Sequence, residues 1–229
     1  MNYRHPTGSV PKVVDLVALG PSQRDYHAML HSQYTPGMPK ADEVWTLNKG
    51  IRSIVCDLAF VLDDLIGEER KSAQYADELR KFAWRTPVIT SELTKAERES
   101  FPGMFYEYPL REVLEYVGTR INLARTEQTG EEQATSGYQV GIDNGQYMHN
   151  SIPMILAYAL AIGVREIRLF GCDYTLRSSD HLEANRPNAE YWVGMLRAFG
   201  VRVMVAPSTT LLNTDQGRRI YGYARQPKL

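Results

Sequence analysis

Short apolar runs alternate with helical segments along most of this chain, and this alternation constrains the fold more than any other feature. The first run, Val13–Gly20, is rich in β-branched residues, nearly continuous in apolar side chains, and ends at a glycine. Strands that are buried on both faces have this composition. Such strands separated by helices predict an α/β fold, with a mainly parallel, Rossmann-like sheet that has helices on both faces.

The same patterns give the bounds of the expected elements. The predicted strands are Val13–Gly20, Glu43–Asn48, a run that starts near Ile51, Thr86–Ser91, Glu166–Gly171 and Val201–Pro207. The predicted helices are Pro21–Tyr34, Glu68–Trp84, Leu110–Arg125, Asn150–Gly163 and Asn188–Gly200. The helix Asn150–Gly163 is the clearest, because capping residues precede it, Pro153 lies in its first turn and a glycine follows its last turn.

One domain is expected, because the chain has no internal repeat and no linker rich in proline, glycine or serine. The prediction is a single Rossmann-like domain over residues 1–229, with a mobile insert or lid around residues 118–148. Within this insert, Thr126–Gly137 is polar and has no apolar periodicity. Surface loops that close over sites often have this character.

Charge and hydropathy exclude some classes of function. The formal net charge is -1, which gives no reason for a strong non-specific affinity for nucleic acid. No apolar run approaches the roughly 20 residues of a membrane helix, and the N-terminus lacks the apolar core of a secretory signal. Cys56 and Cys172 lie in apolar runs and are expected to be free thiols. The prediction is a cytoplasmic protein of a bacterium, or of a host cell if a virus encodes it, with no membrane partner.

Small and polar residues follow the predicted strands. In an open α/β sheet, ligands bind outside the carboxyl ends of the strands, where the strand order reverses. Small residues there let backbone N–H groups approach a ligand, and the start of the next helix favours an anion such as phosphate. The candidate nucleotide-binding residues are Gly20, Pro21, Ser22, Asn48, Asp57, Asn150, Ser151, Gly171 and Tyr174.

These residues also have structural explanations. Ser22 can cap the helix after a tight turn, Asn48 can form a turn, and Asp57 can bind a backbone amide at a strand end. Asn150 can cap its helix, and capping is compatible with ligand contact. The chain has no Gly-x-Gly-x-x-Gly motif after its first strand and no P-loop, so residue patterns alone leave both explanations open.

Asp173 and His181 are the candidate catalytic residues. Asp173 follows the predicted strand Glu166–Gly171, and His181 lies further along a polar loop that precedes a helix. A histidine at the carboxyl edge of a sheet is well placed to act as a general base near neutral pH. The alternative is a solvated loop histidine. No set of residues is assigned to a metal.

Three stretches, "VVDLVALGPS", "DEVWTLN" and "NSIPMILAYALAIGVREIRLFGCDYT", resemble a superfamily of modified Rossmann domains. It includes the bacterial sialyltransferases that use a CMP-activated sugar, and a group that is 6-hydroxymethylpterin pyrophosphokinase-like or associated with flagellin glycosylation. The shared motifs are a strand ending in Gly-Pro-Ser, a second strand ending in Asn, a serine near the start of an Ala-rich helix, a strand ending in Gly-x-Asp followed by Phe or Tyr, and a later Pro-x-Ser that Pro207 and Ser208 would match. The resemblance implies the glycosyltransferase type A variant of the Rossmann fold.

The resemblance also implies a function: a nucleotide-sugar-dependent, metal-independent glycosyltransferase that requires no cofactor besides its donor. Gly20–Ser22 and Asn48 would hold the phosphate and ribose side of the nucleotide. Asn150 and Ser151 would donate hydrogen bonds to the phosphate or the base.

The chemical step is assigned to the two catalytic candidates by the same resemblance. Asp173 would orient the ribose or the acceptor. His181 would take the proton from the attacking hydroxyl as the nucleotide leaves, which is the kind of base that inverting sugar transfer needs. The acceptor is left open between a sugar, a protein side chain and a modified nucleobase in DNA, and a homo-oligomer is compatible with the sequence.

Two alternatives stay open. The first is a Mg²⁺-dependent pyrophosphokinase-like transferase, whose metal would need carboxylates such as Asp57, Asp63, Asp64 and Asp173. The second is a nucleotide-binding protein without catalysis. Activity that survives a chelator favours glycosyl transfer over the first, and a measurable turnover excludes the second.

Overall fold

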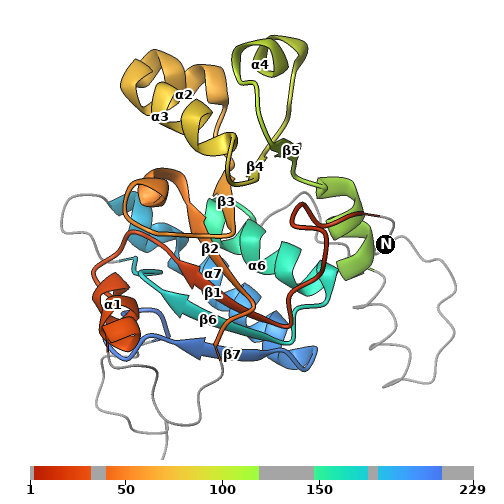
Figure 1. The fold of residues 1–229 in the computed structure, drawn as a ribbon. Coiled ribbons are helices and arrows are strands. Elements are labelled where there is room, and N and C mark those ends of the chain that lie inside the picture. The colour runs from red at the N-terminus through yellow and green to blue at the C-terminus, as the bar shows by residue number, and fades with distance from the viewer. Residues whose placement is uncertain (1–2, 32–39, 119–146, 175–179, 213–229) are drawn as a thin grey trace, which may run out of the picture.

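A seven-stranded parallel sheet organises the protein (Figure 1). The computed structural model describes residues 3–31, 40–118, 147–174 and 180–212, and for residues 180–184 it describes the backbone alone. The strand order is β5-β4-β3-β2-β1-β6-β7, and every neighbouring pair is parallel. The predicted α/β, Rossmann-like fold class is confirmed.

The elements have the following bounds. The strands are β1 Val13–Val17, β2 Glu43–Leu47, β3 Leu58–Val61, β4 Val88–Thr90, β5 Phe105–Glu107, β6 Glu166–Phe170 and β7 Arg202–Val205. The helices are α1 Gln23–His31, α2 Leu65–Lys71, α3 Ala73–Ala83, α4 Lys95–Ser100, α6 Ser151–Ile162 and α7 Asp180–Ala198, with a 3-10 helix η1 at Asn48–Arg52. A further helix runs from residue 110 to residue 118, where that described segment ends.

The strand order reverses beside β1. The chain builds the sheet outward from β1 to β5, and then returns to place β6 and β7 on the other side of β1. The register aligns Val17 of β1 with Phe170 of β6 and with Thr46 of β2. The carboxyl ends of β1 and β6 are therefore neighbours at the topological switch point, where open α/β sheets bind ligands.

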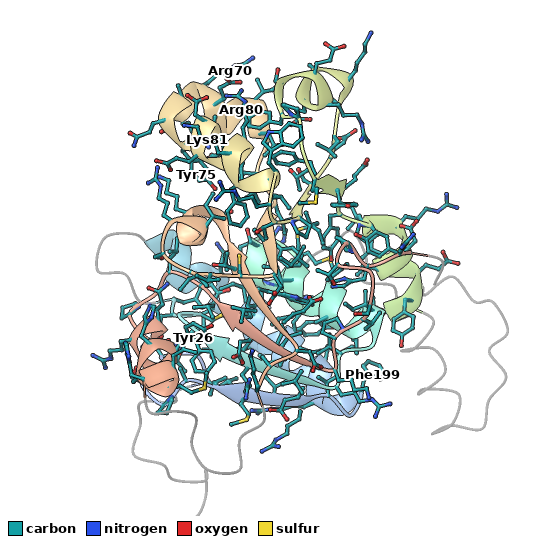
Figure 2. The ribbon with its side chains drawn as sticks, in the orientation of Figure 1. Tyr26, Arg70, Tyr75, Arg80, Lys81 and Phe199 are labelled. Atoms are coloured by element: carbon teal, nitrogen blue, oxygen red, sulfur yellow. The ribbon has the colours of Figure 1, made fainter. Side chains whose placement is uncertain are left out.

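Helices cover both faces of the sheet. On one face, α6 and α7 pack against apolar side chains that include Leu16 and Leu169. On the other face, Tyr26 reaches from α1 towards the sheet, and its ring centroid lies 5.4 Å from that of Phe170 (Figure 2). Burial on both faces explains why the central strands are nearly continuous apolar runs.

Two predicted helices have different bounds. The segment Glu68–Trp84 was predicted as one helix, but the extended backbone of Ser72 separates α2 from α3. The Ser72 hydroxyl oxygen caps α3 by accepting a hydrogen bond from the backbone N–H of Tyr75, a role that favours a helix start at serine. The last helix was predicted to begin at Asn188, yet α7 begins at Asp180 and continues through Pro187. Pro187 has no backbone N–H, so α7 lacks one helical hydrogen bond. The apolar packing of α7 against α6 offsets this loss.

The middle of the chain adds elements that the sequence patterns did not place. A capping box between Thr94 and Glu97 starts α4, and β5 becomes the edge strand next to β4. Figure 1 shows α2, α3 and α4 grouped at the top of the molecule. The predicted helix Leu110–Arg125 is confirmed over residues 110–118. The predicted insert around 118–148 falls almost entirely outside the described residues.

Two compositional expectations can be compared with the structure. Cys56 and Cys172 are both free, as predicted. No helix within the described segments is long and apolar enough to cross a membrane.

Candidate functional site

Two loops meet at the switch point and hold each other in place. After β1, the backbone N–H of Gly20 donates to the carbonyl oxygen of Gly171, which follows β6, at 2.8 Å. In return, the backbone N–H of Gly171 donates to the hydroxyl oxygen of Ser22 at 2.9 Å. Ser22 is fully buried, and this hydrogen bond of its hydroxyl oxygen joins the two turns. A ligand contact by Ser22 stays a prediction.

The Asp173 carboxylate extends this contact to a third segment. One oxygen accepts a hydrogen bond from the backbone N–H of Ser22 at 2.6 Å, and the other accepts from the backbone N–H of Thr210 at 3.1 Å. The residue is 8% exposed, and a buried carboxylate needs such donors to offset the loss of water. Asp173 thus fixes the loops that follow β1, β6 and β7. Its predicted role in orienting a substrate is not tested by this geometry.

The glycines of the two loops are required by close approach. A Cβ on Gly20 would lie 2.6 Å from the carbonyl oxygen of Gly171 and 2.7 Å from a carboxylate oxygen of Asp173. Gly171 has φ +66, and a Cβ there would overlap the carbonyl oxygen of Ala18. Both glycines therefore allow the loops to pack backbone against backbone.

The start of α6 lies at the same edge of the sheet. The side-chain oxygen of Asn150 caps α6 by accepting from the backbone N–H of Ile152 at 3.1 Å, and it also accepts from the Tyr174 hydroxyl at 3.1 Å. The side-chain nitrogen of Asn150 is buried and has no hydrogen-bond partner among the described residues. Tyr174 is buried, which raises its pKa, so the hydroxyl stays protonated as a donor. Ser151 is the first residue of α6, where unpaired backbone N–H groups favour an anion.

Asn48 follows the carboxyl end of β2, next to β1. Its φ of +48 is left-handed, a conformation that asparagine tolerates better than most residues. Its side-chain oxygen is buried without a hydrogen-bond partner among the described residues. Asn48 and Asn150 therefore each place an unsatisfied amide atom at the carboxyl edge of the sheet, and such atoms in a native fold call for a partner such as water or a ligand.

The structure does not bring Asp57 to this edge of the sheet. The apolar residues that begin near Ile51 were predicted to be a strand, which would have put Asp57 near the strand's end. Instead η1 occupies residues 48–52 and β3 begins at Leu58, so Asp57 lies at the amino edge of the sheet. There its carboxylate accepts from the backbone N–H of Val44 at 2.8 Å.

The carboxylates that a Mg²⁺ site would need lie at opposite edges of the sheet. Asp57 lies at the amino edge, while Asp63 and Asp64 follow the carboxyl end of β3. Both oxygens of Asp173 already accept backbone hydrogen bonds. Among the described residues, no three His, Cys, Asp or Glu side chains are grouped to hold a metal ion.

His181 lies in the first turn of α7, which begins at Asp180, rather than on the loop before it. Because α7 connects the carboxyl end of β6 to the amino end of β7, its first turn lies at the carboxyl edge of the sheet. The backbone therefore brings His181 to the same edge as Asp173. The orientation of its side chain lies outside what the structure describes.

At the opposite edge of the sheet, Glu43 is the centre of a group of hydrogen bonds, and one carboxylate oxygen of Glu166, at the start of β6, is buried without a described partner. The Glu43 carboxylate accepts from the indole N–H of Trp45 at 2.6 Å and from the Thr7 hydroxyl, and it lies 3.1 Å from a ring nitrogen of His5. Burial alone would raise the pKa of Glu43, but the hydrogen bonds with His5, Thr7 and Trp45 outweigh burial, and the pKa is lowered. The described unpaired side-chain atoms of Asn48 and Asn150 lie at the carboxyl edge, as the fold class predicts for a ligand site.

The residue patterns missed two residues that organise the site, Asp25 and Thr210. The Asp25 carboxylate accepts from both the backbone N–H and the hydroxyl of Ser208, at 2.8 and 2.7 Å. Thr210 contributes the backbone N–H that binds Asp173. A backbone donor carries no residue-type signal, and Asp25 reads as an ordinary acidic residue in a first helical turn.

Comparison with known proteins supports the fold. No protein-family model matches the sequence, and no curated protein matches it. Among solved structures, the sialyltransferase CstII from Campylobacter jejuni in complex with CMP superposes with a TM-score of 0.50 at 16% identity, covering 89% of this chain and 84% of that chain. CstII with CMP-3FNeuAc gives 0.47 at 17% identity, with 86% and 81% covered, and the monofunctional α-2,3-sialyltransferase Cst-I from the same organism gives 0.47 at 12%, with 87% and 78% covered. At 16% identity, the TM-score of 0.50 with the CMP complex of CstII shows a similar fold.

The close approach of the two loops at Gly171 predicts that a larger residue there destabilises the fold. Gly171→Ala should lower the free energy of unfolding by roughly 3 kcal/mol or more, because it combines left-handed strain with overlap against Ala18. Gly163→Ala is the matched control, since Gly163 also has a left-handed φ of +92 but no atom within 4 Å of its added Cβ. The control should cost about 1 kcal/mol. Urea unfolding measures both, and equal losses would contradict the proposed overlap.

Proposed function

We propose that the protein is a nucleotide-sugar-dependent, metal-independent glycosyltransferase that moves a sugar to a hydroxyl acceptor, with His181 as the base. One observation carries the proposal. At the switch-point edge of the sheet, Asn48 and Asn150 each hold a buried amide atom without a described partner, beside the packed turns at Gly20–Ser22 and Gly171–Asp173. A nucleotide would satisfy these atoms, because its base, ribose and phosphate offer both donors and acceptors.

Three further features support nucleotide binding. The site lies where Rossmann-like sheets bind nucleotides. The N-terminus of α6 offers unpaired N–H groups to a phosphate. The solved structure with a TM-score of 0.50 is a sialyltransferase in complex with CMP, and it has the same fold.

The proposed reaction uses each group once. The acceptor hydroxyl oxygen attacks the anomeric carbon of the donor sugar, and the bond from that carbon to the phosphate oxygen breaks. The hydroxyl proton moves to a ring nitrogen of His181, and the bonding electrons leave with the nucleotide. The N–H groups at the start of α6, beside Ser151, stabilise the charge that grows on the phosphate. Asp173 contributes by holding the three loops that frame the nucleotide.

Nucleotide binding is tested by a substitution at Asn48. Asn48→Gly removes the side-chain amide but keeps the left-handed backbone unstrained, so the free energy of unfolding should change little. Loss of one buried hydrogen bond should weaken nucleotide affinity about tenfold. A thermal-shift screen of CMP, UDP, GDP and ADP selects the ligand, and calorimetry then compares its Kd for the two proteins. Equal Kd values would remove Asn48 from the site, and a wild-type protein that binds none of the four would contradict the proposed function.

The role of His181 as the general base is tested by its replacement with alanine. His181→Ala should lower the transfer rate by roughly a hundredfold or more, as expected for loss of a general base, while the Kd for the nucleotide stays unchanged. The wild-type rate should survive a chelator. An unchanged rate in the variant would exclude the histidine base, and activity that requires added Mg²⁺ would favour the pyrophosphokinase-like alternative.

A further inference from the structure

Residues 208–212, here called the strap, follow β7 and are held by carboxylates from three different elements. The backbone N–H of Ser208 donates to Asp25 of α1 at 2.8 Å, and that of Thr210 donates to Asp173 at 3.1 Å. The backbone N–H of Leu212 donates to Glu190 of α7 at 3.0 Å. Every second amide of the strap thus binds a carboxylate, and the ladder hydrogen bonds of β7 do not extend to these residues.

The first of these carboxylates makes the most contacts with the strap. One oxygen of Asp25 accepts both the backbone N–H and the hydroxyl of Ser208. The Asp25 side chain is 21% exposed, so solvent only partly screens its bonds. Hydrogen bonds to an ionised acceptor are stronger than neutral ones. Asp25 also lies in the first turn of α1, where the helix dipole favours its charge.

The strap connects Asp25 to the switch-point turns through a continuous set of bonds. Asp25 binds Ser208, two residues along the strap Thr210 binds Asp173, and Asp173 binds the backbone N–H of Ser22. Asp25 is in the same helix that Ser22 precedes, so the bonds close a ring through α1. Hydrogen bonds in such a network can contribute more together than the sum of their separate contributions.

We propose that Asp25 is a positioning residue for the nucleotide site: by clamping Ser208, it holds the strap against Asp173 and so keeps the Gly20–Ser22 turn in its binding geometry. The inference rests on the proposed function. Asp25 acts through Ser208, and its effect on the ligand passes through the strap. A site whose loops are fixed before binding loses less conformational entropy when the ligand arrives, and loosening the strap should therefore weaken binding.

A matched control separates this role from ordinary stabilisation. Asp42 also accepts two hydrogen bonds on one carboxylate oxygen, from the backbone N–H groups of Lys12 and Val13 at 2.7 and 2.9 Å. It lies at the amino edge of the sheet, just before β2. Asp25→Ala and Asp42→Ala each remove two hydrogen bonds to an aspartate, but the first does so beside the candidate site and the second at the opposite edge.

The experiment measures the Kd of the nucleotide selected by the screen of CMP, UDP, GDP and ADP, together with urea unfolding, for each variant. Asp25→Ala should raise the Kd roughly tenfold, and Ser208→Ala, which removes the hydroxyl donor alone, should raise it in the same direction by less. Asp42→Ala should lower stability and leave the Kd unchanged. If Asp25→Ala fails to fold, the Kd values of Ser208→Ala and Asp42→Ala are compared instead.

Each result has one meaning. A raised Kd with Asp25→Ala and Ser208→Ala, and an unchanged Kd with Asp42→Ala, supports the positioning role. An unchanged Kd with the two strap variants overturns it, as does an equal rise with Asp42→Ala, which would indicate general softening of the fold. In both cases a wild-type protein that binds the nucleotide leaves the proposed function standing, whereas a wild-type protein that binds none of the four nucleotides overturns both.

Discussion

The carboxylate of Asp173 is the interaction on which the rest of the site depends. It is nearly buried, and its two oxygens accept backbone N–H groups from Ser22 and Thr210. Ser22 and Asp173 are 151 residues apart in sequence. A carboxylate this far from water is stable only with such donors. The hydrogen bonds that stabilise the charge of Asp173 therefore also hold the loops together. The positions of the loops after β1, β6 and β7 are consequently fixed relative to one another.

Buried side-chain atoms without a described partner occur at both edges of the sheet, and one oxygen of Glu166 is such an atom at the amino edge. At the amino edge, the Glu43, Asp42 and Asp57 carboxylates all accept hydrogen bonds from neighbouring segments. At the carboxyl edge, Asn48 and Asn150 each have a buried amide atom with no partner among the described residues. Because unpaired buried groups are costly in a native fold, their position beside the switch point is the physical argument for a ligand there.

The sequence predicted most of the sheet and the carboxyl-edge residues, for a physical reason. Strands buried on both faces require apolar runs such as Val13–Gly20, and the helix after Asn150 carries its own capping signals. Other features depend on partners that local patterns do not contain. Asp57 was misplaced because the apolar run before it suggested a strand, whereas it pairs with Val44 before β3 begins. The link from Asp173 to Thr210 uses a backbone donor, which no residue type marks.

Amide NMR shifts, compared between the free protein and the protein with bound CMP, test most directly where the nucleotide binds. The largest shift changes should cluster at the carboxyl edge of the sheet, at Gly20, Asn48, Ile152 and Gly171, if the nucleotide binds at the switch point. Changes centred on the amino-edge pocket lined by Asp42, Glu43, Asp57 and Arg85, with the carboxyl edge unaffected, would contradict it.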